Sequence, residues 1–319
     1  GTPSRLQIAD LKLQIDTIYE NYKVAQNPEI TLEANPDDLS EEYLIELSKI
    51  GINRLSIGIQ SFFEDDLAMM NRAHNSVEAQ KCLELATQYF DNISIDLIYG
   101  IPGMSDEQWQ QNIETALRFG VPHISSYALT VEPKTALNTL IQKGKIEAPK
   151  DEVAEAHFQI LVETLEKNGF IHYELSNFGK ENYFSKNNSA YWLGKKYIGI
   201  GPSAHSYDGI SRSWNVANNA LYLKAIQQNQ LPNEKEILST ADRYNEYIMT
   251  GLRTIWGVAL DRIEREFGLD YLDYLIKQSE KFVKDELLAI ENNILKPTSK
   301  GKFLTDGIAS DLFYINLEE

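Results

Sequence analysis

The chain has 319 residues, of which 43% are hydrophobic and 24% charged, and it carries a formal net charge of −17 at pH 7. These proportions are typical of a globular protein that holds one large and one small domain, and no run of 18 apolar residues predicts a transmembrane helix. The acidic surface repels phosphate groups, which argues against nucleic acid and anionic membranes as partners.

The first 130 residues alternate between helix-like and strand-like segments. Apolar residues at helical spacing predict a helix over residues 6–22, and residues 29–36 are typical of a short strand. Ser40 is a suitable N-cap for the next helix, and Gly51 lies just past its end. Further strands and helices are expected over residues 53–61, 64–89, 92–103, 106–120 and 122–130. This βαβα order predicts a parallel sheet with helices outside it, either part of a (βα) barrel or an open doubly wound sheet.

The rest of the chain changes in style. Residues 133–170 are typical of helices and 171–178 of a strand, whereas 179–218 are rich in Gly, Asn, Ser and aromatic residues and predict a long irregular segment. Three helices and a hairpin are expected near the C-terminus, a winged-helix-like module whose acidic charge favours packing over DNA binding. The predicted class is α/β: a partial (βα) TIM-like barrel plus a small C-terminal helical domain. The expected divisions are a barrel at 1–208, a linker at 209–235 and the helical domain at 236–319.

Cysteine and histidine usage gives little support for a metal site within this chain. Cys82 is the one cysteine, and its amphipathic surroundings predict a buried, inert thiol in a reducing compartment, for which we expect the cytoplasm. None of the five histidines forms an HxH or HxxxH pair. His205 lies in the Gly-rich run GIGPSAHSY and is either a ligand or acid–base group, or a loop residue bonded to backbone.

Polar residues gather where the predicted strands end. Glu33 ends EITLEANP, Gln60 ends RLSIGIQS, Asp96 lies in ISIDLIYG, and Arg72 lies in the connection after Gln60. Because the active groups of a (βα) barrel lie at the C-terminal ends of its strands, we expect these side chains to share one rim. Structural alternatives exist: Glu33 can pair with Arg72, and Gln60 can cap a strand end. A carboxylate inside an apolar run, as at Asp96, needs a partner in either case.

Eight motifs follow one another along the chain: GTPS, TLEANP, NRLSIGIQSF, NRAHNS, DLIYGIPG, YELSNF, NNSAYW and YIGIGPSAHSY. With them the sequence resembles the oxygen-independent coproporphyrinogen III oxidase family of radical S-adenosylmethionine (SAM) proteins, and within it the heme-chaperone, HemW-like branch. The resemblance covers nearly the whole chain. It implies a partial (βα) barrel, a C-terminal helical domain, a [4Fe–4S] cluster on a CxxxCxxC loop, and SAM bound to the unique iron of that cluster.

The resemblance also implies roles for particular residues. The turn at Gly1 and Thr2 looks like a SAM contact, and four further residues look like SAM ligands: Glu33, Gln60, Arg72 and Asp96. The chemistry agrees, because the ammonium, sulfonium, carboxylate and hydroxyl groups of SAM suit carboxylates, an amide and a guanidinium. In the oxidase branch, a 5′-deoxyadenosyl radical abstracts a propionate hydrogen from coproporphyrinogen III, and decarboxylation gives a vinyl group. No residue of this chain is assigned as catalytic.

The sequence departs from the family pattern in two places. It has no CxxxCxxC loop, and Cys82 alone cannot hold a cluster, so we expect the natural protein to continue before Gly1 and this chain alone to lack the first barrel strand and radical chemistry. Asn187 stands where the proposed heme-binding motif His-Asn-x-x-Tyr-Trp has its His, and an amide is a poor ligand for heme iron. The candidate region for heme or substrate comprises Asn188, Tyr191, Trp192 and His205, with the last as a substitute iron ligand.

Three functions follow as hypotheses: a heme chaperone that delivers heme to an apo-protein, a coproporphyrinogen III dehydrogenase, and a non-catalytic remnant or scaffold. The run GIGPSAHSY and the compact C-terminal module favour the chaperone. The expected cofactors are SAM, a [4Fe–4S] cluster in the full-length protein, and heme. The expected partners are heme or porphyrin, an electron donor, and a heme-accepting apo-protein.

Overall fold

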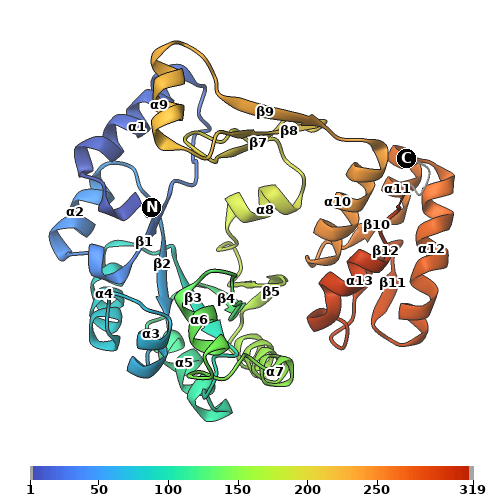
Figure 1. Cartoon of the computed structure of the whole chain (residues 1–319), viewed down its shortest axis with the longest axis horizontal. Coiled ribbons are helices and arrows are strands. Elements are labelled where there is room, and N and C mark those ends of the chain that lie inside the picture. Colours follow the sequence, from blue (N-terminus) through green and yellow to red (C-terminus); the bar gives the residue numbers. More distant parts are fainter. Residues whose placement is uncertain (1–2, 316–319) are drawn as a thin grey trace. The chain divides into compact units, whose positions relative to one another are not determined.

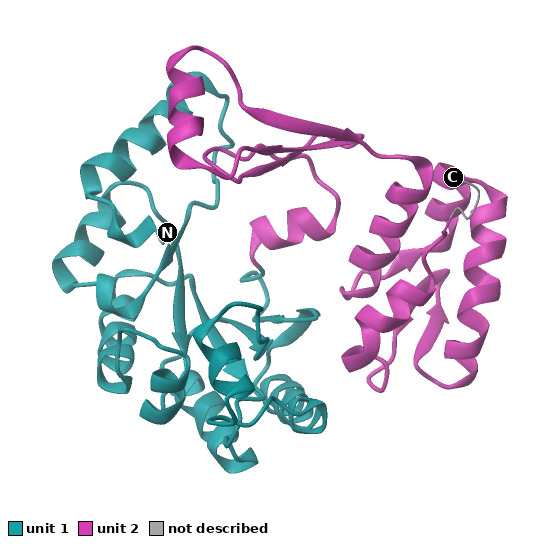
Figure 2. Ribbon diagram, in the orientation of Figure 1, with its two compact units in different colours: residues 1–184 teal, residues 185–319 magenta. Residues whose placement is uncertain are grey.

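The computed structural model describes residues 3–315 of the chain. It divides after Phe184 into two units, which we call unit 1 (Gly1–Phe184) and unit 2 (Ser185–Glu319) (Figure 2). The predicted turn at Gly1 and Thr2 lies outside the described residues.

Unit 1 alternates strands and helices in the order that the sequence predicts (Figure 1). Its elements in chain order are η1 (Pro3–Arg5), α1 (Ile8–Asn21), β1 (Thr31–Ala34), η2 (Pro36–Asp38), α2 (Glu41–Lys49), β2 (Arg54–Gln60), α3 (Glu64–Met69), α4 (Ser76–Tyr89), β3 (Ile93–Tyr99), α5 (Asp106–Arg118), β4 (His123–Ala128), α6 (Ala136–Gln142), α7 (Asp151–Lys167), β5 (Ile171–Glu174) and β6 (Asn177–Gly179). Local chemistry explains the helix starts. The Ser40 hydroxyl accepts a bond of 3.2 Å from the Tyr43 amide, which confirms this predicted cap. Asn75 and Glu78 form a reciprocal capping box that starts α4, so the helical region expected over residues 64–89 divides into α3 and α4.

The sheet of unit 1 has six strands in the order β1-β2-β3-β4-β6-β5. The first four run parallel, as the βαβα pattern predicts, and β6 is antiparallel to both of its neighbours. The single strand expected over 171–178 is wrong, because the chain turns back after Glu174 to form the β5–β6 hairpin. The Glu174 carboxylate accepts a bond of 3.2 Å from the Ser176 amide within this turn, so a side chain supplies the turn signal that Gly or Pro usually gives.

One face of this sheet carries the core of unit 1. Since successive side chains of a strand point to opposite faces, Ile57, Ile95 and Ile124 fall on the same face, and all three are fully buried. Helices such as α2, α4 and α5 lie outside the strands and cover this face (Figure 1). Trp109 of α5 is fully buried and donates a bond of 2.8 Å from Nε1 to the His157 carbonyl oxygen of α7.

Unit 2 begins with α8 (Lys186–Trp192) and a three-stranded antiparallel sheet of β7 (His205–Tyr207), β8 (Ser211–Asn215) and β9 (Asn233–Ile237), with α9 (Asn219–Gln227) between β8 and β9. The irregular segment predicted over 179–218 is therefore wrong in part. The residues expected to form a linker, 209–235, contain β8, α9 and the start of β9. These strands are short and carry polar or exposed residues, so hydrophobic periodicity gives no signal for them.

The C-terminal part of unit 2 has its own core. It consists of α10 (Thr240–Leu252), β10 (Val258–Ala259), α11 (Leu260–Phe267), α12 (Leu269–Lys284), β11 (Leu288–Glu291), β12 (Ile294–Pro297), η3 (Lys302–Leu304) and α13 (Thr305–Asp311). The three helices and the β11–β12 hairpin match the predicted winged-helix-like module, with β10 as a third strand. Tyr244, Ile248, Val258 and Leu275 are fully buried at its centre. Among residues 3–315, every helix is too short or too polar for a membrane span.

Candidate functional site

The second face of the sheet in unit 1 is polar, and we call it the polar face. Glu33, Ser56, Ser94 and His123 form one cross-strand row over β1 to β4. The next row contains Asp96, Ser125 and Asn177, and Glu174 pairs with the last of these across the hairpin. In most (βα) barrels branched apolar side chains fill the interior. A sheet face that carries two such polar rows is typical of a binding surface for a polar ligand.

Gln60 and Arg72 lie together at the end of β2. Arg72 Nη2 donates bonds of 3.1 Å to Asn35 Oδ1 and 3.3 Å to the Gly58 carbonyl oxygen. Gln60 has a φ of 69°, which an L-residue rarely adopts, so its side chain leaves the regular alternation of the strand. A Cβ at Gly58 would stand 2.8 Å from Gln60 Nε2 and 3.2 Å from Arg72 Nη2. Glycine at this position therefore lets both polar side chains approach the backbone of β2.

The charges on the polar face perturb one another. Burial, and then the negative charge of Glu33, raise the pKa of Asp96 to about 7, against the opposing effects of Ser125, Arg54 and Arg72. Burial also raises the pKa of Glu33, while Arg54 lowers it. Glu33 nevertheless keeps access to solvent, because the face it lies on is open at β1. The carboxyl groups of Glu33 and Asp96 thus share this part of the face with the guanidinium groups of Arg54 and Arg72, and a ligand with charges of both signs would fit it.

Sequence reasoning missed several residues of the polar face. Arg54 is buried, and within the described residues its Nε has no hydrogen-bond partner. His123 is fully buried between Ser94 Oγ at 2.7 Å from Nδ1 and the Tyr173 hydroxyl at 2.8 Å from Nε2, and burial holds its pKa well below the usual range. Glu174 is buried as well. The available signal was polar residues at alternate positions of predicted strands, as in the run HISS, which point toward one face.

The structure brings the four predicted SAM ligands to one region of unit 1. Glu33 and Asp96 lie on the polar face of β1 and β3, and the charge of Glu33 raises the pKa of Asp96. Arg54 lowers the pKa of both carboxyl groups, and Arg72 lowers that of Asp96. Gln60 lies within van der Waals range of the Gly58 backbone beside Arg72. Their role as ligands stays a prediction.

The residues predicted for heme or substrate lie in unit 2, where ring contacts form an aromatic strip. The Tyr191 ring is 4.3 Å from the Tyr197 ring, which is 6.1 Å from the Tyr207 ring, measured between centroids. His205 lies two residues before Tyr207 on the same face of β7, and its ring is 6.2 Å from Trp214. We call these five residues the aromatic strip.

Two other predicted residues of this region have structural partners in unit 2. The Arg253 guanidinium lies 5.1 Å from the centre of the Trp192 ring, a cation–π contact. The Asn188 amide donates a bond of 3.2 Å to the Ser185 hydroxyl, which caps α8. Of the residues predicted for heme or substrate, Tyr191 is therefore the one that ring contacts connect, through Tyr197 and Tyr207, to the strand that carries His205.

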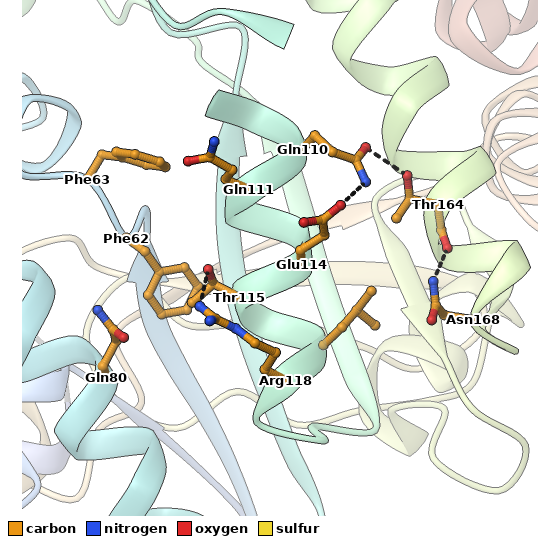
Figure 3. A pocket seen from close by; sticks show the side chains of 11 residues that line it. Phe62, Phe63, Gln80, Gln110, Gln111, Glu114, Thr115, Arg118, Thr164 and Asn168 are labelled. Carbon is orange, nitrogen blue, oxygen red and sulfur yellow. Dashed lines mark hydrogen bonds between the residues drawn. The ribbon is translucent and has the colours of Figure 1, made fainter. Parts of the chain in front are cut away.

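Each unit also has a groove, and the groove of unit 2 is lined in part by Tyr197 and Tyr207 of the aromatic strip. A groove of about 690 Å³ lies on the helical side of unit 1. Figure 3 shows its lining side chains, among which Thr164 of α7 bonds to Gln110 of α5 and Gln110 bonds to Glu114. A second groove of about 560 Å³ lies beside β7 and β8, with Lys196, Ile198 and Lys235 among its lining residues. None of the predicted site residues lines either groove.

The thiol and histidine groups give no metal site within residues 3–315. No group of three or more His, Cys, Asp or Glu side chains in this range could hold a metal ion. Cys82 is buried in α4, and burial, with a smaller effect of Asp37, raises the pKa of its thiol to about 12. Its thiolate is therefore scarce at neutral pH, as expected for an inert thiol.

Comparisons with known proteins agree with the family that the sequence motifs predict. Residues 5–116 match the model of the Radical SAM superfamily, and residues 238–304 match that of the HemN C-terminal domain. The chain is 35% identical over 308 residues to the heme chaperone HemW of Bacillus subtilis, covering 95% of this chain and 81% of that protein. It is 33% identical over 318 residues to the heme chaperone HemW of Lactococcus lactis, covering 97% of this chain and 84% of that protein.

Among solved structures, the fold resembles that of the coproporphyrinogen III oxidase HemN from Escherichia coli, described as a radical SAM enzyme. The TM-score is 0.83 at 21% sequence identity, and the match covers 98% of this chain and 76% of that one. At this identity the likeness shows the fold alone. It confirms the predicted α/β class of partial barrel with a C-terminal helical domain.

Proposed function

This chain belongs to the HemW family of radical SAM proteins, and from this premise we propose that it binds SAM on the polar face of unit 1 and heme at the aromatic strip of unit 2. A heme chaperone that passes heme to an apo-protein is the function these sites support best. The observation that carries the proposal is the pairing of two features in one chain: carboxylates and guanidiniums on the polar face of a (βα) sheet, and a line of aromatic rings beside an exposed imidazole.

The donor set of the polar face fits SAM. SAM carries an ammonium and a sulfonium, which suit the carboxylates of Glu33 and Asp96, and a carboxylate, which suits the Arg72 guanidinium. The buried Nε of Arg54 has no partner among residues 3–315, which leaves a donor for an anionic or hydroxyl group of the ligand. The absence of a side chain at Gly58 leaves room for the ends of Gln60 and Arg72 to converge against the backbone of β2.

The single thiol of this sequence does not fit a [4Fe–4S] cluster. A cluster of this type takes three or four cysteine ligands, whereas the 319 residues hold only Cys82, which is buried and has a raised pKa. In radical SAM proteins the cluster supplies the electron that cleaves SAM. The proposed functions of this chain are binding functions, and neither SAM binding by the polar face nor heme binding by the strip requires that electron.

The aromatic strip supports heme binding. Aromatic rings offer flat apolar surface for a macrocycle, and an imidazole is a good ligand for heme iron. Asn187 carries an amide where the family motif has an imidazole, so we propose that His205 is the axial ligand in this chain. His205 is exposed, and its ring contact is with Trp214, which leaves its nitrogens accessible.

Heme titration followed by Soret absorbance tests this proposal. We expect a shifted Soret band for the parent protein, loss of axial coordination in His205→Ala, and an unchanged melting temperature for that variant because its side chain is exposed. The variant Asn187→His should bind heme more tightly than the parent. A Soret spectrum identical in the parent and His205→Ala would contradict the assignment of the ligand.

The alternative activity is that of a coproporphyrinogen III dehydrogenase. The fold likeness to HemN favours it, whereas the curated relatives at 33–35% identity are named heme chaperones. Incubation of cluster-loaded full-length protein with coproporphyrinogen III, SAM and a reductant separates the two. Formation of protoporphyrinogen would contradict the chaperone as the sole function.

A further inference from the structure

The exit of β2 holds Gln60 in a strained backbone conformation. The Ser61 amide donates a bond of 2.9 Å to the Ile59 carbonyl oxygen, and Gln60 between them has a φ of 69°. A bond between residues two apart, around a central residue of positive φ, defines a γ-turn of the rare and strained kind. Such a conformation persists only where the surrounding structure imposes it. The chain on both sides of Gln60 must therefore be held by other groups.

Helix α5 holds the chain after Gln60 through Asn112. Asn112 is fully buried, and its Oδ1 accepts a bond of 2.7 Å from the Phe62 amide. The Phe62 ring lies beside α5 (Figure 3), with its centroid 6.2 Å from that of Phe119. Because a buried backbone amide costs stability unless it is bonded, the Asn112 bond fixes the direction that the chain takes after the γ-turn.

Ser61 and Asp66 hold the same segment from the side of α3. The Phe63 amide donates a bond of 3.1 Å to the Ser61 hydroxyl oxygen, and that hydroxyl donates its single proton to Asp66 Oδ2 at 2.6 Å. Ser61 is fully buried and Asp66 nearly so. Ser61 Oγ also lies 3.2 Å from Asn112 Oδ1, so the supports from α3 and α5 meet directly behind the turn.

The connection after α3 holds the chain before Gln60. His74 is buried, and its Nε2 lies 3.0 Å from the Ile59 carbonyl oxygen. Because a carbonyl oxygen only accepts, Nε2 carries the ring proton and donates it. Arg72, two residues earlier, donates a bond of 3.3 Å to the Gly58 carbonyl oxygen. The two carbonyl groups that precede Gln60 are thus bonded to one short segment of the chain.

We propose that four buried side chains are positioning residues for Gln60, and we call them the turn clamp: Ser61, Asp66, His74 and Asn112. The turn clamp keeps Gln60 in the strained turn, which places its side-chain amide beside the guanidinium that is predicted to bind SAM. The four residues act on ligand binding through Gln60. Their role in binding rests on the proposed SAM site, whereas their hold on the backbone does not.

Two substitutions of Gln60 measure the strain without SAM. Gln60→Gly and Gln60→Ala both remove the side-chain amide, but only alanine brings a Cβ to the positive φ. In a regular strand glycine is the less stable of the two residues. At this turn Gln60→Gly should instead melt about 2 °C or more above Gln60→Ala. A melting temperature of Gln60→Ala equal to or above that of Gln60→Gly overturns the proposal.

The same pair of variants shows whether Asn112 imposes the turn. Asn112→Leu keeps the shape of the side chain and removes the acceptor of the Phe62 amide, so the turn can relax and the difference between the two Gln60 variants should shrink in that background. Ile113→Ala is the matched control, because Ile113 is fully buried on the same helix and apolar. It should lower the melting temperature and leave the difference unchanged. An undiminished difference in Asn112→Leu overturns the role of Asn112.

Calorimetric titration of SAM tests whether the turn clamp acts through Gln60. Asn112→Leu alone should weaken SAM binding by about tenfold. Combined with Gln60→Ala, it should cause no loss beyond that of Gln60→Ala, because the side chain through which it acts is absent. Ile113→Ala should leave the affinity at the parent value. A further tenfold loss in the double variant overturns the positioning role.

The melting and binding experiments fail separately. If the Gln60 variants melt as expected and the parent binds no SAM, the proposed SAM site fails, and with it the role of the turn clamp in binding, while its hold on the backbone stands. If the parent binds SAM and Gln60→Gly melts no higher than Gln60→Ala, the SAM site stands and the turn clamp is overturned.

Discussion

A single methyl group added at Gly199 should disrupt the backbone that holds the aromatic strip. A Cβ at this glycine would stand 2.1 Å from the His205 carbonyl oxygen and 2.8 Å from its carbonyl carbon. Both are backbone atoms, so no side-chain rotation can relieve the contact. In Gly199→Ala the segment around Tyr197 must therefore move away from β7.

The cost follows from the bonds that this movement breaks. Tyr197 and Tyr207 exchange two backbone hydrogen bonds of 3.0 Å, and the Gly199 amide donates a bond of 2.9 Å to the Ser206 hydroxyl. At about 0.5–1.5 kcal/mol for each net hydrogen bond, the loss of the two backbone bonds amounts to about 2 kcal/mol. This free energy corresponds to a roughly 30-fold rise in the opening equilibrium of the pair.

Hydrogen exchange and heme titration together measure this prediction. The amides of Tyr197 and Tyr207 should exchange roughly 30-fold faster in Gly199→Ala, and heme affinity should fall by at least about tenfold because the strip no longer holds its rings in place. Gly307→Ala is the control: a Cβ at Gly307 in α13 meets nothing within 4 Å, so both quantities should stay at the parent values. Unchanged protection of Tyr207 in Gly199→Ala would refute the packing argument, and unchanged heme affinity would refute the role of the strip.

Three further predictions concern single residues. Gly58→Ala should weaken SAM binding by about tenfold in calorimetry while leaving the melting temperature nearly unchanged, because its Cβ meets the flexible ends of Gln60 and Arg72 and no closer backbone atom; equal SAM affinity would count against the site. Hydrogen bonds from Ser211 and Ile210 hold the pKa of Asp208 below its usual range, so their stabilising effect is present above about pH 4 and is lost as the pH falls further. In Asp208→Asn the free energy of unfolding should therefore depend less on pH in the acid range than in the parent. An equal pH dependence in the two proteins would contradict this. The Cys82 thiol should react with a disulfide reagent at pH 8 only in denaturant, and fast labelling of the folded protein would show that α4 is not packed as described.

The barrel strands and helices were predictable because their sequences carry strong periodic patterns. In unit 1 the buried strands have apolar residues on the core face, and helices such as α2 and α4 begin at a side-chain cap, so local chemistry and the fold agree. The β5–β6 hairpin was not predictable from turn residues, since its turn depends on Glu174 accepting the Ser176 amide. The strands β7 to β9 were missed because cross-strand pairing, and not hydrophobic alternation, defines them.

The functional residues also divide into those that the sequence predicted and those that only the structure reveals. Glu33, Gln60 and Arg72 were found because each stands near a strand end or in the connection after it, and Asp96 was found because its carboxyl group interrupts the apolar run of β3. Arg54 was missed, since its burial and its position beside the two carboxylates depend on the register of β1 against β2, and a shift of one residue would turn every side chain of the strand to the other face. Sequence patterns therefore located the rim, and the pairing register decided which further residues share it.

The polar face itself argues that unit 1 is built around a ligand. Buried charged and polar groups such as Arg54, His123 and Glu174 cost stability unless each is paired, and in a (βα) barrel apolar residues could take their places. Most are satisfied by one another, as in the links from Ser94 through His123 to Tyr173. Some are not, and two of these departures are the Nε of Arg54, which has no partner among the described residues, and Asp96, whose pKa of about 7 leaves it poised between acid and carboxylate. Both lie next to the predicted SAM ligands, where a bound molecule with charges of both signs would resolve them together.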